Sequence, residues 1–229
     1  MGAKASFTDL LNPAELKKFF SVNRDIFIRT LGLIFTYAFF VAKSAETGDV
    51  VLAANTILLQ FWYISAYAVD GFAFAAESLA GRFVGAKNPE KLVETVKFSM
   101  IWGLGLGLVG TLAYWVLGEQ ILLLFTDKPM VLQAAGMVLV WTIAAPLVNS
   151  ICFIWDGVFI GATATEAMRN SMLLATIIFF VPVYYLAKPV LGVHAIWLAM
   201  TTFMVVRGLT LSFMAPKHIF KKLKTAGVS

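Results

Sequence analysis

The chain has 229 residues, of which 60% are hydrophobic and only 14% are charged, and its mean hydropathy is +0.83. Soluble domains carry about 25% charged residues, so this composition excludes an ordinary soluble protein and predicts an integral membrane protein. The formal net charge of +5 does not indicate a nucleic-acid partner, because the basic residues are spread over loops and ends with no nucleic-acid-binding motif between them. The single cysteine, Cys152, excludes an internal disulfide.

The first 24 residues are polar, and they lack the apolar core and small-residue cleavage site of a secretory signal peptide. Asn12, Pro13 and Glu15 have the spacing of a helix N-cap, a first helical residue and a capping-box acid. A short helix on the cytoplasmic membrane surface is therefore expected over residues 1–24.

Six apolar runs follow, and they are expected to cross the bilayer, whose hydrocarbon core is about 30 Å thick. The runs cover about residues 25–41, 50–80, 98–117, 130–161, 171–186 and 193–212. In the third run, Gly103 and Gly107 predict the close approach of a neighbouring helix. The sequence therefore predicts an all-α integral membrane protein, with a six-helix transmembrane lobe over residues 25–214 and a basic cytoplasmic tail over 215–229.

The second run carries two carboxylates, Asp70 and Glu77, into the membrane. On a helix they fall on one largely polar stripe, because its members are three or four residues apart. The other members of the stripe are Gln60, Tyr63, Tyr67 and Phe74. An ionised carboxylate near the bilayer centre costs about 2.5–3.5 kcal/mol, so the stripe is expected to face a protein interior or a water-filled cavity. Asp70 is a functional candidate, against the alternative that it only pairs with a basic residue; Glu77 either shares its role or lies at the cytoplasmic headgroups.

The fourth run brings another acid into the membrane. After Pro146, the side chains of Asn149, Cys152 and Asp156 recur at helical spacing, so Asp156 is the second functional candidate. In the first run, Arg29 lies one turn inside the basic end. Its guanidinium either extends to the headgroups or neutralises an intramembrane acid.

The distribution of Lys and Arg predicts the orientation of the chain. Fifteen of the 18 basic residues lie in ends and loops assigned to one face, with Arg169 and Arg207 counted among them. Only Lys43, Lys128 and Lys188 lie on the other face. The positive-inside rule then places both termini in the cytoplasm, in a multi-pass protein of the inner or plasma membrane.

The residues available for chemistry do not favour an enzyme. The only histidines are His194, near one end of the last run, and His218, in the tail, and no Cys–His pair has metal-ligand spacing. No catalytic residue, metal site or cofactor is therefore predicted. Buried acids accompanied by an arginine, aromatic rings and amides are typical of secondary transporters, in which binding of H⁺ or Na⁺ is coupled to movement of a substrate cavity.

Five stretches carry a family resemblance. They are NRDIFIRT at 23–30, LAANTILLQFWYISAYAVDGFAFAAESLAGRFVGAKN at 52–88, LFTDKPMVLQAA at 124–135, DGVFIGAT at 156–163 and LGVHAIWLAM at 191–200. These stretches resemble the multidrug and toxic compound extrusion (MATE) transporters, and within them the DinF-like branch. The resemblance implies a twelve-helix transporter of two six-helix lobes, of which this chain is the C-terminal one, with residues 1–24 as the cytoplasmic amphipathic linker between the lobes. A missing N-terminal lobe or a second copy of the chain is the partner it implies.

The resemblance also implies export of amphipathic, often cationic, drug-like compounds against an inward flow of H⁺ or Na⁺. The residues expected to couple transport to the cation are Asp70, Asp156, Arg29 and Glu77. The residues expected to line the substrate cavity are Tyr37, Gln60, Tyr63, Tyr67 and Asn149. Tyrosine rings suit this role because they bind organic cations through cation–π contacts. Some members carry a Glu inside the first span of this lobe, where this chain carries Arg29, Thr36 and Tyr37 instead.

Two other functions remain open at the level of sequence. A lipid-linked oligosaccharide flippase of the same superfamily would favour a more cationic cavity. A non-transporting membrane subunit would use the ion pairs of Arg29 with Asp70 or Asp156 only to hold helices together.

Overall fold

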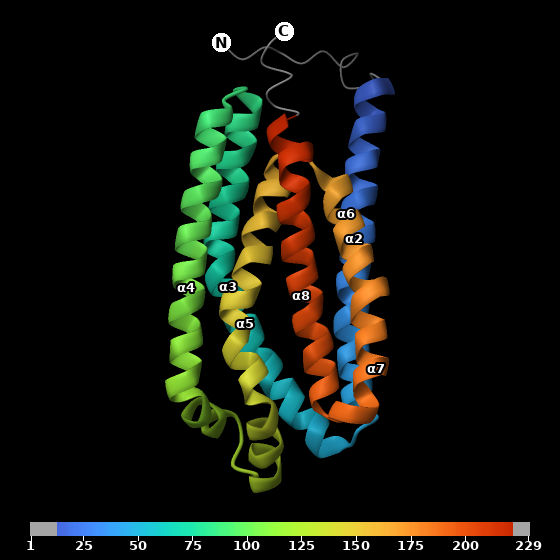
Figure 1. The fold of residues 1–229 in the computed structure, drawn as a ribbon, viewed down its shortest axis with the longest axis vertical. Helices are drawn as coiled ribbons and strands as arrows, with labels where there is room; N and C mark the ends of the chain where they lie inside the picture. Colours follow the sequence, from blue (N-terminus) through green and yellow to red (C-terminus); the bar gives the residue numbers. More distant parts are fainter. Residues whose placement is uncertain (1–12, 222–229) are drawn as a thin grey trace.

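The computed structural model describes residues 13–221, and within that range the regular structure is entirely helical. The helices are α2 (Pro13–Ala45), α3 (Asp49–Gly85), α4 (Pro89–Phe125), α5 (Pro129–Gly161), α6 (Thr165–Leu173), α7 (Val181–Leu191) and α8 (His194–Ala215), with π-helical segments η1 (Leu174–Phe180) and η2 (Pro216–Lys221). Successive long helices run in opposite directions, and the first and last described residues lie at the same end of the bundle (Figure 1).

Six helices among the described residues are long and apolar enough to cross a membrane, which confirms the predicted multi-pass membrane protein. Helix α5 occupies the centre and packs against α3, α4 and α8, while α6 and α7 cover the far side of α8 and contact α2 (Figure 1). The large apolar side chains on the outside of the bundle are those expected to meet lipid, because a membrane protein has no need to bury them.

The first helix is longer than the sequence indicates. Helix α2 begins at Pro13 and continues without a break to Ala45, and its apolar span begins at Phe19. Residues 13–24 therefore extend the first span, rather than forming the separate surface helix expected from their polar composition. Residue 12, the expected N-cap, lies outside the described residues, as do residues 222–229 of the basic tail.

The turn between the second and third spans follows directly from its sequence. Helix α3 ends at Gly85, and α4 begins at Pro89, in the first helical position where the missing N–H of proline costs nothing. Asn88 caps α4, since its side-chain oxygen accepts a hydrogen bond of 3.0 Å from the backbone N–H of Lys91.

The fifth span, predicted as one helix, is continuous but irregular. Its middle, η1, is π-helical, and the second residue of α7 is Pro182. A proline cannot donate the backbone hydrogen bond of an α-helix, so the preceding turns have to rearrange. The π-helical segment lies immediately before this proline.

Glycines allow the helices of the core to approach closely. A Cβ at Gly157 would overlap the backbone carbonyl of Ala73, and one at Gly161 would overlap that of Glu77, so α3 and α5 touch backbone to backbone. The approach expected at Gly103 and Gly107 is confirmed, because these residues pack directly against α5. The contact at Gly157 and Gly161 sets the relative position of α3 and α5, the helices that carry Asp70 and Asp156.

Candidate functional site: an intramembrane charge cluster

Asp156 is the centre of an ion-pair cluster that joins three helices. Its Oδ2 accepts a hydrogen bond of 2.6 Å from Nη2 of Arg29 on α2 and another of 2.6 Å from Nη2 of Arg207 on α8. Asp156 itself lies on α5, near the close approach to α3. A single carboxylate oxygen therefore links α2, α5 and α8.

The cluster lies in the interior of the lobe. Asp156 is 8% exposed and Arg207 is 2% exposed, whereas the side chain of Arg29 retains 17% exposure. Buried charges are tolerated only when they are paired, so Asp156 and Arg207 neutralise each other and Arg29 adds one positive charge. Nε of Arg29 is also buried without a hydrogen-bond partner. Arg29 is thus the least constrained member of the cluster.

Arg207 is the member that sequence reasoning missed. It was counted among the charges of the C-terminal side, and that assignment is wrong, because Arg207 lies inside α8 and is almost completely buried. The signal was present in the sequence: Arg207 interrupts the apolar run MTTFMVVRGLTLSFM, and an ionisable residue within a membrane span is a functional candidate by default.

Asp70 lies on α3 one turn before Ala73, whose backbone touches Gly157 on α5, so it lies near the part of α5 that carries Asp156. Asp70 and Glu77 are both half-buried, and neither forms an ion pair or a hydrogen bond with another described residue. The structure therefore distinguishes the candidate acids: Asp156 is held by two arginines, whereas Asp70 and Glu77 have no such partner within residues 13–221.

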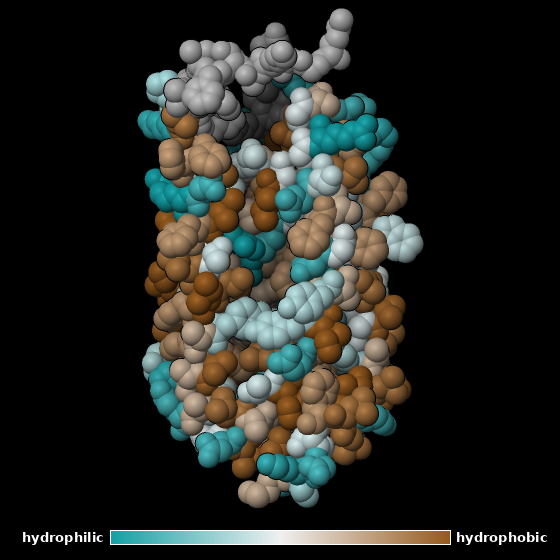
Figure 2. Space-filling model, turned by 180° about the vertical axis from the view of Figure 1, so that it is seen from behind, coloured by the Kyte–Doolittle hydropathy of each residue, from teal (hydrophilic) through white to brown (hydrophobic). Residues whose placement is uncertain are grey.

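The polar stripe of α3 is expected to face either a protein interior or a water-filled cavity. Within this lobe it is not buried, so the first of these two environments is not the one observed. Gln60 is exposed, Tyr67 is 72% exposed and Phe74 is 66% exposed, although Tyr63 is half-buried. Helix α3 lies behind α5 in Figure 1 and so comes forward in Figure 2, where this face of the molecule is hollowed and hydrophilic side chains lie in and beside the hollow.

The other expected cavity residues lie in two different places. Tyr37 on α2 is half-buried, and its ring centroid lies 5.5 Å from that of Tyr63 on α3, so these rings form one aromatic contact between the helices. Asn149 is 1% exposed inside the bundle, and neither polar atom of its amide has a hydrogen-bond partner among the described residues. The structure does not bring Asn149 to the face that carries Tyr67.

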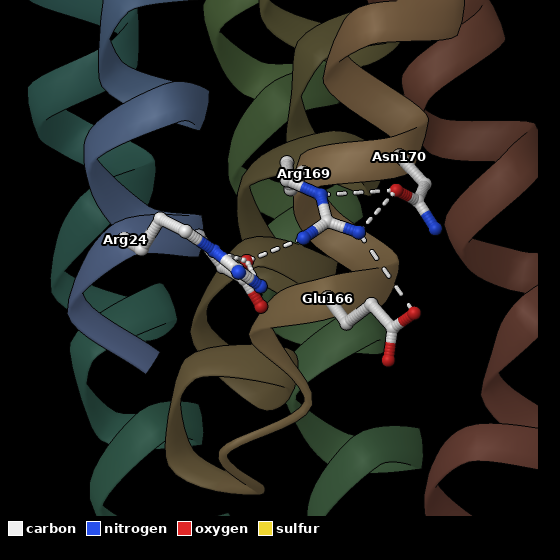
Figure 3. A network of polar contacts seen from close by, with 5 residues as sticks. Arg24, Glu166, Arg169 and Asn170 are labelled. Carbon is white, nitrogen blue, oxygen red and sulfur yellow. Dashed lines mark hydrogen bonds and ion pairs between the residues drawn. The ribbon is translucent and has the colours of Figure 1, made fainter. Parts of the chain in front are cut away.

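A second ion-pair network joins α2 to α6 (Figure 3), and α6 lies towards the end of the bundle where the first and last described residues lie (Figure 1). Nη1 of Arg169 on α6 donates to Oδ1 of Asp25 on α2 at 2.5 Å, and the same oxygen accepts from Arg24 at 3.2 Å. Arg169 also contacts Glu166 and Asn170, on its own helix. The sequence predicts neither partner: it places Arg169 in a loop, whereas in the structure Arg169 lies on α6 and pairs with Asp25, which is only 3% exposed.

Six helices long and apolar enough to cross a membrane, with an ion cluster buried between them, define a polytopic membrane protein. The MatE family model matches residues 26–186, and the chain belongs to this family.

The curated relatives are longer than this chain. It is 34% identical over 204 residues to DNA damage-inducible protein F of Escherichia coli K12, which covers 89% of this chain but 44% of that protein. It is 28% identical over 182 residues to Protein DETOXIFICATION 43 of Arabidopsis thaliana, and the match covers 80% of this chain and 34% of that protein. The chain thus spans less than half the length of these two relatives.

Solved structures show the same fold. The Vibrio cholerae MATE transporter VcmN in its bent form superposes with a TM-score of 0.83 at 18% identity, covering 94% of this chain and 49% of that one. A MOP superfamily transporter from Pyrococcus furiosus superposes with a TM-score of 0.79 at 18% identity, and the match covers 96% of this chain and 50% of that one. The fold is therefore that of one half of a MATE transporter, as the sequence predicted.

Proposed function

We propose that the chain is one lobe of a secondary active exporter of amphipathic, often cationic compounds, driven by the inward movement of H⁺ or Na⁺. In this proposal the termini face the cytoplasm of a cell bounded by the inner or plasma membrane, as the positive-inside rule indicates. The family membership supports export, and the intramembrane charges support cation coupling.

One observation carries the proposal: Asp70 has no charged partner among the described residues, although Asp156 nearby is held by two arginines. A half-buried carboxylate without a counter-charge is costly in a membrane, and binding of a proton or Na⁺ removes that cost. We therefore assign the coupling ion to Asp70 first, with Glu77 as a further acid on the same helix.

Asp156 and Arg29 then act as the electrostatic partners of this site. Neutralising Asp70 removes a negative charge near Asp156 and Arg29. The electrostatic attraction that holds the Arg29 side chain of α2 against α5 then becomes weaker. Arg29 is the more exposed of the two arginines, so its contact is the one expected to change while Arg207 stays bound. Movement of α2 relative to α5 would alter the substrate face of the lobe.

The substrate path in this proposal runs along the exposed side of α3. Tyr67 is largely exposed, and one helical turn away the half-buried ring of Tyr63 contacts that of Tyr37 at a tilt of 39°. Aromatic rings hold organic cations by contacts worth about 0.5–2 kcal/mol, which suits loose selectivity. Gln60 adds an exposed amide to the same helix face. A second lobe, either the missing N-terminal half or a second copy, would close the path from the opposite side.

The test is ethidium efflux from drug-sensitive cells that express the chain alone or together with a matching N-terminal lobe. Asp70→Asn is expected to abolish efflux without lowering the amount of protein in the membrane. Asp127→Asn is the matched control, because Asp127 lies in the exposed α4–α5 connection. A protonophore and a sodium-free medium identify the ion. Efflux that is unchanged in Asp70→Asn would refute the assignment of coupling to Asp70.

The non-transporting subunit has one observation in its favour, namely that the cluster at Asp156 joins three helices as a purely structural ion pair would. It predicts that Asp156→Asn lowers the yield of membrane protein whereas Asp70→Asn changes nothing. Absence of efflux from every combination, with the wild-type protein present in the membrane, would favour this function or a lipid flippase.

A further inference from the structure

A recess lies at the end of the lobe opposite the first and last described residues. The α2–α3 and α7–α8 turns lie side by side there (Figure 1). The recess is shallow, with an enclosed volume of about 10 Å³, and four helices or their ends contribute to it. Two lysines line it, Lys43 from α2 and Lys188 from α7. No carboxylate lines the recess, so the charge presented to its interior is positive.

The two ammonium groups are held in place rather than extended into solvent. Nζ of Lys188 donates to the Tyr184 hydroxyl at 2.7 Å and lies 5.2 Å from the centroid of that ring. Nζ of Lys43 lies 5.6 Å from the centroid of Phe39 and 5.9 Å from that of Tyr185. Cation–π contacts of this kind position a cation but leave most of its N–H donors unused.

Of the two lysines, only Lys188 has a charge that no described carboxylate offsets. Lys43 forms an ion pair of 2.6 Å with Glu46, whose side chain is 57% exposed, so its charge is offset on the solvent side. Lys188 forms no ion pair with a described carboxylate. Both ammonium groups therefore have donors free for an anion.

The floor of the recess is polar but already satisfied. Trp197 on α8 donates to Asn55 on α3 at 2.9 Å, and Asn55 donates to the hydroxyl of Ser44 on α2 at 2.8 Å. Asn55 is 2% exposed and Ser44 is 1% exposed, so this chain of hydrogen bonds fixes three helices below the lysines. The floor supplies rigidity, and the lysines supply the binding groups.

The position of the recess identifies the anion. Lys43 and Lys188 lie two and three residues before the ends of their membrane spans, next to Tyr184 and Tyr185. Tyrosine and lysine near span ends mark the headgroup layer, in which every phospholipid carries an anionic phosphodiester. We propose that Lys43 and Lys188 together bind the phosphate of an anionic phospholipid and so join α2 to α7 at this end of the lobe. This site is separate from the charge cluster at Asp156 and does not depend on transport.

The test measures lipid binding to the purified chain in detergent by native mass spectrometry, with dioleoylphosphatidylglycerol and dioleoylphosphatidylcholine as probes. Phosphatidylglycerol is expected to bind more tightly than phosphatidylcholine. The double variant Lys43→Gln, Lys188→Gln is expected to weaken phosphatidylglycerol binding about 10- to 30-fold, since each lysine near a membrane surface contributes about 1 kcal/mol. The matched control is Lys128→Gln, an exposed lysine in the α4–α5 connection at the same end, and it is expected to bind as the wild type does.

Three results would overturn the proposal. An equal loss in Lys128→Gln would indicate diffuse surface charge, and an unchanged affinity in the double variant would exclude the two lysines. Displacement of phosphatidylglycerol by inorganic phosphate at the same concentration would indicate a site for free anions. If the double variant does not fold, Lys188→Arg and Lys188→Gln replace it: the arginine variant is expected to retain binding and the glutamine variant to lose it, and equal binding by both would refute the site.

Discussion

Removal of the carboxylate at the centre of the cluster is the sharpest perturbation of this lobe. In Asp156→Asn, both guanidiniums lose their counter-charge, and Arg207, at 2% exposure, cannot reach water. Breaking a buried ion pair on one side costs about 3–5 kcal/mol, so we expect the free energy of unfolding to fall by that amount. Arg29→Gln leaves Asp156 paired with Arg207 and removes one charged hydrogen bond, for which the expected loss is about 1.5–3 kcal/mol.

A charge-matched double variant separates electrostatics from packing. Asp156→Leu with Arg207→Met removes one positive and one negative charge, so it is expected to be more stable than Asp156→Asn, although it changes more atoms. The assay is unfolding of the purified chain by sodium dodecyl sulfate in dodecylmaltoside micelles, followed by loss of helical circular dichroism. Asp127→Asn serves as the control, with an expected change below about 0.5 kcal/mol. The reasoning is refuted if Asp156→Asn unfolds like the control, or if the double variant is the less stable of the two.

Three further outcomes follow from contacts elsewhere in the bundle. Gly157→Ala forces α3 and α5 apart and is expected to lower the free energy of unfolding by about 1–3 kcal/mol in the same assay. The control is Gly71→Ala, which is expected to be neutral or slightly stabilising because its new Cβ meets no atom within 4 Å. Arg169→Gln leaves the buried Asp25 with one weaker partner and is expected to speed hydrogen exchange in the adjoining part of α2, and unchanged exchange would contradict this role. Asn55→Leu leaves a buried indole N–H without its acceptor and is expected to cost about 1–3 kcal/mol and to shift tryptophan fluorescence, and an unaltered spectrum would refute that bond.

Composition and periodicity were sufficient to predict the six-helix architecture of this protein. An apolar run in a membrane has to satisfy its backbone internally, so six such runs determine six helices whatever their tertiary packing. The turn at Asn88 and Pro89 and the close approach at Gly103 and Gly107 are equally local, because they depend on proline, capping and small side chains. The family resemblance, carried by whole stretches of sequence, also stands on the sequence alone.

Helix boundaries were harder to predict from the sequence, because polar residues can continue a helix beyond the membrane. The polar composition of residues 13–24 predicted a separate linker, yet a helix that has already started at Pro13 gains a hydrogen bond with each added residue and does not stop at a headgroup layer. The π-helical segment before Pro182 was also not predicted, since proline indicates that a helix is perturbed but not how.

The partners of the charged residues were decided only by the tertiary structure. The sequence shows that Asp70, Asp156 and Arg29 lie in membrane spans, but Arg29 and Asp156 are 127 residues apart, and a spacing of that size carries no information about contact. Arg207 joins them because α8 packs on α5, and Asp25 meets Arg169 because α2 packs on α6. Periodicity identifies the face of a helix on which a charge lies, and only the packing of one helix against another decides which opposite charge it meets.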